Sequence, residues 1–168
     1  MIVSVRGILE AVGPAWGHLQ VGGISLQISV PGSDINELGP MGGQVRLFTH
    51  LRIRDEQPVL YGFSSTPAMQ LFLMLNGVSG VGPRLSLALL SSLGVSSLQQ
   101  AIANGDIASL SSAPGVGQRT AGRIALELKS KIDEGAADIG IPGGSDDAVV
   151  IESLMALGYS AVESRQAL

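Results

Sequence analysis

The sequence predicts a multidomain β + α protein with an N-terminal β-barrel, a middle all-helical domain, a flexible linker and a short helical C-terminal domain. Three observations predict this organisation. Residues 1–64 contain two runs that alternate apolar and polar side chains with a period of two, which is typical of half-buried strands. Residues 65–132 change to helical spacing and contain the same glycine turn twice. Residues 133–145 are rich in glycine and acids, as linkers are, and residues 146–168 return to helical spacing.

Two alternating runs predict the barrel. From residue 24 to residue 30 every second side chain is apolar, with serine and glutamine between. Residues 45–54 repeat the pattern, with basic and aromatic side chains on the opposite face. Glycine and proline pairs separate the runs, and short strands at this spacing predict a small barrel. The segment from Ser33 to Leu38 is expected to add one helical turn.

The middle domain is predicted to contain several short helices, each with its own start signal. Thr66 is the expected N-cap of the first helix, and Pro67 is its first residue. The later starts are marked by Pro83, by a capping box from Ser96 to Gln99, and by Asp106 as a cap.

Charge is segregated along the chain, although the net charge is only −4. Residues 1–66 carry −1, residues 67–132 carry +3, and residues 133–168 carry −6. Local charge steers a charged ligand more than the total does, so the middle third is expected to face phosphate.

Composition also narrows the class of protein. Polar residues interrupt every apolar run before it reaches the length of a membrane span, and the N-terminus has no signal-peptide pattern. We therefore expect a cytoplasmic protein without membrane contact. There is no cysteine, and His18 and His50 lie far apart, so no disulfide, metal site or other cofactor is expected.

A glycine turn is repeated within the positive third. GVSGVGPR, residues 77–84, recurs thirty-five positions later as SAPGVGQR, residues 112–119. The spacing is not that of a dinucleotide-binding fingerprint, which also needs a preceding strand. One such turn is most simply a helix–helix connection. Two turns, each with a basic residue inside the next helix, indicate a tandem helix-hairpin-helix that binds successive phosphates of a DNA strand regardless of sequence.

The order of these segments resembles the RuvA family of bacterial Holliday-junction-binding subunits. FTHLRIRDEQPVLYGF, LNGVSGVGPRLSLALL, LSSAPGVGQRTAGRIALELK and a later ALGY segment carry the resemblance. It implies an OB-fold barrel at residues 1–64, tandem helix-hairpin-helix motifs at 65–132, a linker at 133–145 and a motor-binding domain at 146–168.

The resemblance also implies an assembly and partners. The family forms a homotetramer, alone or as two tetramers face to face, that holds a four-way DNA junction open and square. Its partners are the RuvB motor ATPase, with which it supports branch migration in recombination and DNA repair, and the RuvC resolvase.

Site residues follow from the same resemblance. Phosphate contacts are expected from Gly80, Val81, Gly82, Arg84, Gly115, Val116, Gly117, Gln118, Arg119, Thr120 and Arg123. Asp55 and Glu56 correspond to an acidic pin that repels phosphate at the junction centre, with Arg52 and Arg54 beside it. Without the resemblance, these acids would be interpreted as a solvated turn and the arginines as a basic strand face. Gln118 stands where the family often has lysine, which predicts a weaker grip by the second turn.

The C-terminal domain is expected to contact RuvB through Leu154, Leu157, Gly158 and Tyr159. The chain reaches Leu168 without the family's third helix, so this domain is expected to be incomplete, and its binding to RuvB stays open.

Two other functions remain as alternatives. A helix-hairpin-helix glycosylase would need a lysine or aspartate poised beyond the second turn, and a nuclease would need a cluster of carboxylates. The DNA-binding part has neither pattern, so a non-catalytic subunit is expected. A protein-interaction adaptor would show no affinity for DNA even at low salt.

Overall fold

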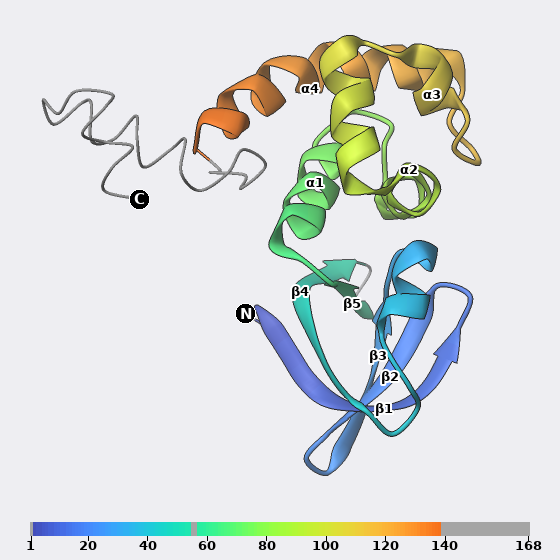
Figure 1. Cartoon of the computed structure of the whole chain (residues 1–168), viewed down its shortest axis with the longest axis vertical. Helices are drawn as coiled ribbons and strands as arrows, with labels where there is room; N and C mark the ends of the chain where they lie inside the picture. Colours follow the sequence, from blue (N-terminus) through green and yellow to red (C-terminus); the bar gives the residue numbers. More distant parts are fainter. Residues whose placement is uncertain (1, 55–56, 139–168) are drawn as a thin grey trace, which may run out of the picture. The chain divides into compact units, whose positions relative to one another are not determined.

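The computed structural model describes residues 2–54 and 57–138 (Figure 1). The chain divides into two compact units, residues 1–132 and residues 133–168. The elements given below belong to the first unit, apart from the end of the last helix.

The N-terminal part is a closed five-stranded barrel with the order β1-β2-β3-β5-β4. Its strands are β1 (Ser4–Gly13), β2 (Trp16–Val21), β3 (Ile24–Ser29), β4 (Gln44–Arg54) and β5 (Gln57–Phe63). The pairing of β3 with β5 is parallel and the others are antiparallel. The predicted helical turn is present as the 3-10 helix η1 (Gly32–Glu37).

The apolar side chains of the alternating strands fill the interior of this barrel. Leu9, Leu19, Ile28 and Leu47 are almost completely buried, and exposed residues alternate with the buried ones along β1 and β4. The β1–β4 register places Val5 opposite Leu47 inside the barrel. Arg6 and Arg46, the next pair on these two strands, therefore point outward, because successive side chains of a strand face opposite ways.

In the described part of the chain, four helices follow the barrel and share a second hydrophobic core. They are α1 (Thr66–Asn76), α2 (Pro83–Asn104), α3 (Ile107–Ser111) and α4 (Gln118–Asp138). Leu71, Leu89, Leu98, Leu110 and Ile124 are buried in this core. As predicted, Asp106 caps α3, because its carboxylate accepts a hydrogen bond from the N–H of Ser109 at 3.0 Å.

Two predicted helix boundaries are wrong. The N-cap of α1 is Ser65, not Thr66, because Ser65 has the extended backbone that a cap requires and its Oγ accepts from the N–H of Ala68. At the other end of the domain, α4 continues to Asp138, six residues into the segment predicted as linker. Alanine has the highest helix propensity of any residue, and this extension contains two of them.

Helix α2 is bent. Gly94 has a φ of 69° and a ψ of 173°, which breaks the helix into two segments, so a second segment starts near Ser96 as predicted. The break is made by the positive φ of Gly94. By length and mean hydropathy alone α2 is sufficient to cross a membrane, contrary to the sequence prediction. Its residues Leu89, Leu98 and Ile102 instead form the core of the helical part.

Candidate nucleic-acid interface

The two glycine turns have the same conformation. Gly80 and Gly115 have φ angles of 84° and 85°. In the first turn the N–H of Val81 donates to the carbonyl of Val78 at 3.0 Å, and in the second the N–H of Val116 donates to that of Ala113 at 3.0 Å. Each turn then leads directly into a helix, α2 or α4. The sequence repeat is therefore a repeat of structure.

The amides of Val81 and Val116 are not available to a ligand. Both N–H groups already donate within their own turns, and both side chains are buried in the helical core, at 4% and 5% exposure. These valines anchor the turns, whereas the sequence prediction placed them among the phosphate contacts. The sequence could have signalled this, because each valine is an apolar residue between two glycines.

Glycines contribute matching free donors to the two turns. No acceptor in the described chain receives a hydrogen bond from the N–H of Gly80, Gly82, Gly115 or Gly117. Gly82 and Gly117 also adjoin the first turns of α2 and α4, where the helix leaves N–H groups unpaired and its dipole favours an anion. The two turns thus present matching sets of donors suited to phosphate oxygens.

Gly82 and Gly117 are not required as glycine by the fold. Gly82 has φ −99° and ψ 177°, which any residue can adopt, and the φ of Gly117 also lies outside the left-handed region. Apart from its own chain neighbours, a Cβ added at either position would meet no atom of the described residues within 4 Å. Because glycine has no side chain, the surface at these positions stays open directly at the N-terminus of a helix. A ligand backbone that must approach closely is a physical reason for such a space.

Basic side chains stand beside both turns. Arg84 and Arg119 are exposed in the first turns of α2 and α4. No salt bridge is present among the side chains that the structure describes, so none of the described carboxylates occupies either guanidinium group. Gln118 is the exposed first residue of α4, and Thr120, the third, is half-buried.

Arg123 joins the two motifs. It belongs to the helix after the second turn, but its Nη1 donates to the carbonyl of Ser79 in the first turn at 2.9 Å. Leu85, from the helix after the first turn, packs against Gly115 in the second, where an added Cβ would lie 2.9 Å from Leu85 Cδ2. Each turn is therefore held by the other motif's helix. The sequence gives no local signal of this contact, because Arg123 and Ser79 are 44 positions apart.

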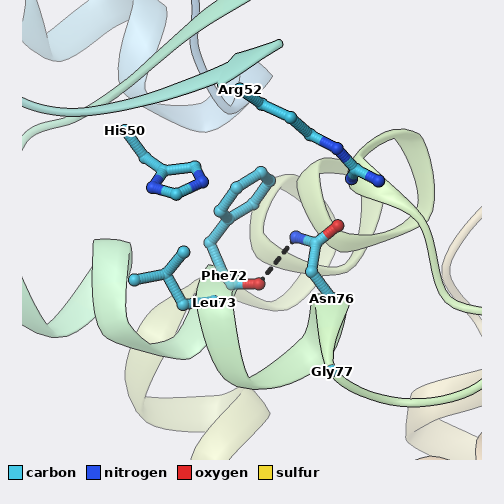
Figure 2. Close-up of a pocket in the computed structure, with 6 residues that line it drawn as sticks. All are labelled: His50, Arg52, Phe72, Leu73, Asn76 and Gly77. Carbon is cyan, nitrogen blue, oxygen red and sulfur yellow. Dashed lines mark hydrogen bonds between the residues drawn. The ribbon is translucent and has the colours of Figure 1, made fainter. Parts of the chain in front are cut away.

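Arg52 lines a pocket between the barrel and α1. The pocket has a volume of about 360 Å³ and is lined by His50, Arg52, Phe72, Leu73, Asn76 and Gly77. Figure 2 shows Arg52 reaching from β4 toward Asn76, which is the last residue of α1 before the first turn. Asn76 Nδ2 donates to the carbonyl of Phe72 at 2.8 Å, while its Oδ1 is buried and has no hydrogen-bond partner among the described residues. Arg52 thus stands next to the start of the first turn.

Other predicted site residues are only partly placed. Arg54 ends β4 and pairs with Gln57 of β5, so the two strands flank the predicted pin. Asp55 and Glu56 themselves lie outside the described residues, as do the predicted motor-binding residues Leu154, Leu157, Gly158 and Tyr159. Within the part of the chain that the structure describes, no group of three histidine, aspartate or glutamate side chains is arranged to hold a metal ion.

Comparison with known proteins agrees with this architecture. A family described as RuvA N terminal domain matches residues 1–62, and one described as SAM-like Helix-hairpin-helix tandem matches residues 72–130. These matches confirm the predicted barrel and tandem motifs.

Curated relatives match over the whole of this chain. One from Chloroflexus aurantiacus is 42% identical over 170 residues, which cover 100% of this chain and 87% of the relative. Others from Herpetosiphon aurantiacus and Dehalococcoides mccartyi are 41% and 40% identical, again over 100% of this chain and 87% of each relative. All three are named Holliday junction branch migration complex subunit RuvA.

Proposed function

The chain belongs to the RuvA family of Holliday junction branch migration complex subunits, and we propose that it binds four-way DNA junctions through its two glycine turns. Membership makes it a non-catalytic subunit of that complex and not a helix-hairpin-helix repair enzyme. The observation that carries the binding mode is the pair of glycines, Gly82 and Gly117, that fold and packing do not require.

Each turn binds one stretch of phosphate backbone. The N–H groups of Gly80 and Gly82, or of Gly115 and Gly117, donate to phosphate oxygens, and Arg84 or Arg119 adds a charge-assisted contact. None of these groups reads a base edge, so binding is independent of sequence. Because Arg123 and Leu85 fix one turn against the other, the two contacts are made together by one rigid unit.

Recognition of the junction itself needs more than phosphate contacts. We propose that four copies assemble around one junction, so that Asp55 and Glu56 of each copy surround the point where strands exchange. Repulsion between these carboxylates and phosphate keeps the centre open. The observation in support is that β4 and β5, which flank this pair, form a regular hairpin up to Arg54 and Gln57.

Partners complete the proposal. The names of the relatives place them in a branch migration complex, and we propose the RuvB ATPase as the motor that acts on the bound DNA, with contacts from Leu154, Leu157, Gly158 and Tyr159. Binding of the RuvC resolvase to the same junction and a cytoplasmic location are proposed on family membership alone.

The test is a competition gel shift with a labelled four-way junction and excess duplex of the same sequence, over a salt series. Junction binding is expected to survive the competitor and to weaken as salt rises, because phosphate contacts release counterions. Equal competition by duplex would reduce the protein to a general phosphate binder. Absence of binding at low salt would favour the adaptor.

A second experiment addresses the acidic pin. Replacing Asp55 with Asn and Glu56 with Gln is expected to preserve or tighten binding to duplex while the preference for the junction falls. An unchanged preference in the same competition assay would eliminate the pin and leave the turn contacts in place.

A further inference from the structure

The outer face of the barrel carries a set of side chains that the proposed DNA contacts do not use. We call it the β1–β4 face, and it consists of Arg6, Ile8, Gln20, Gln44, Arg46 and Phe48. The register places Arg6 of β1 directly opposite Arg46 of β4. In the next row Ile8 lies between Gln20 of β2 and Gln44 of β4.

Arg6 and Arg46 form a like-charge pair. Side chains directly opposite each other on neighbouring strands have Cβ atoms about 4.5–5.5 Å apart, and like charges at that distance destabilise a sheet. Both arginines are exposed, and neither forms a salt bridge with a described residue. The other charged residue on the outer side of β1, Glu10, accepts a hydrogen bond from Ser25 Oγ at 2.6 Å. The two guanidinium groups therefore have no counter-ion from the described part of their own chain.

Arg46 is also held in position. Its Cζ lies 5.1 Å from the centroid of the Phe48 ring, which is a cation–π contact. Guanidinium N–H groups point outward in the plane of the group, so a ring on one side leaves most of these donors free. An anion that bridges Arg6 and Arg46 would meet one arginine already oriented.

A hollow adjoins Arg6. It has a volume of about 360 Å³ and is lined by Arg6, Gly7, Ile8, Gln20, Val21, Gly22 and Gln44. Its side-chain polar groups are the guanidinium of Arg6 and the carboxamides of Gln20 and Gln44, all of which have N–H donors. No carboxylate is among these lining residues, so the polar groups of the hollow are suited to an acceptor-rich ligand.

We propose that the β1–β4 face is a second binding surface for the phosphodiester backbone of DNA, separate from the two glycine turns. Two adjacent guanidinium groups with flanking amide donors fit the oxygens of a phosphodiester, and basic side chains beside an aromatic ring are typical of sequence-independent nucleic-acid contact. The inference depends on the proposed function, because it assumes that the ligand of this chain is DNA.

The test compares two double variants with the parent, each as the full chain. One is Arg6→Gln with Arg46→Gln, which removes both charges. The other is Arg6→Lys with Arg46→Lys, which keeps the charges and serves as the matched control. Affinity for a fluorescein-labelled four-way junction is measured by anisotropy over a salt series, and Tm and particle size are measured without DNA.

The glutamine variant is expected to bind the junction on the order of tenfold more weakly, with a salt dependence shallower by about 0.9 for each phosphate that it no longer neutralises. The lysine variant should keep the parent's salt dependence. Without DNA, the Tm of the glutamine variant should equal or exceed the parent's at low salt, because the like-charge repulsion is removed.

Two outcomes would overturn the inference. In the first, the parent binds the junction and the glutamine variant has the same affinity and salt dependence. In the second, the glutamine variant forms smaller particles and has a lower Tm, which would assign the face to contact between protein chains. Failure of the parent itself to bind the junction would instead contradict the proposed function.

Discussion

Arg123 donates a hydrogen bond of 2.9 Å from its Nη1 to the main-chain carbonyl of Ser79, and so ties the helix of the second hairpin to the turn of the first. In return, Leu85 of the first motif's helix packs on Gly115 in the turn of the second. Each motif therefore contacts the turn of the other, as a pseudo-twofold arrangement would require. One of these contacts is a hydrogen bond and the other is apolar packing. Their separation is fixed before any DNA is bound.

From this contact we predict a positioning role for Arg123, and a salt series can distinguish that role from a phosphate contact. Arg123→Gln should weaken junction binding, because the first turn is no longer supported, while the slope of log affinity against log salt stays near the parent's. Arg119→Gln is the matched control and should make the slope shallower by about 0.9 for each phosphate that is no longer neutralised. Equal changes of slope in the two variants would show that Arg123 binds phosphate directly.

The barrel and both turns can be predicted from the sequence, because each is indicated by residues that are close together in the chain. Strand alternation, turn glycines and the Asp106 cap each act within a few residues. The contact between Arg123 and Ser79 has no local signal, because the two residues are 44 positions apart. The bond from the N–H of Val81 to the carbonyl of Val78 likewise depends on the conformation of the folded turn. The N-cap of α1 was misplaced by one residue, because both Ser65 and Thr66 are good capping residues and only backbone conformation separates them.

The four turn glycines should separate into two classes. Gly82→Ala and Gly117→Ala are expected to leave the stability unchanged, or to raise it by about 0.4–1 kcal/mol, because both positions accept a Cβ without strain. The same variants should bind DNA more weakly, since the methyl group occupies the space for phosphate. Denaturant unfolding and anisotropy with labelled junction measure the two effects. Unchanged affinity in a folded variant would contradict the assignment of the turns.

Gly80→Ala and Gly115→Ala serve as the comparison. Both should lose about 1–2 kcal/mol of stability, because a residue with a Cβ is strained at a φ near 85°. Gly115→Ala should lose more than Gly80→Ala, since its Cβ would also meet Leu85 Cδ2 at 2.9 Å, whereas at Gly80 the nearest atom is 3.6 Å away. Equal stabilities for all four alanine variants would contradict this division.

Asn76 should be replaceable by an apolar residue. Its Oδ1 is buried and finds no partner in the part of the chain that the structure describes, and such an atom costs about 1–3 kcal/mol of desolvation. Asn76→Leu removes this cost together with the Nδ2 bond to Phe72, so the free energy of unfolding is expected to stay level or to rise by about 1 kcal/mol. Denaturant unfolding measures the difference. A clear loss of stability would show that Oδ1 has a partner in solution, and Arg52, which reaches toward it in Figure 2, would be the first candidate.

Asp106 should make the stability of α3 depend on pH in the acid range. Hydrogen bonds from the Ser109 side chain, and then from the Ser109 N–H, lower the pKa of Asp106 from its ordinary value of 3.8. A pKa that is lower in the folded state contributes stability above the unfolded value, and this contribution is lost as pH falls from 3.8 through the folded pKa. Asp106→Asn keeps a capping side chain without the charge, so its Tm should lie below the parent's at pH 6 and approach it near pH 2. A constant Tm difference between parent and variant across this range would show that the charge of Asp106 contributes nothing to the cap.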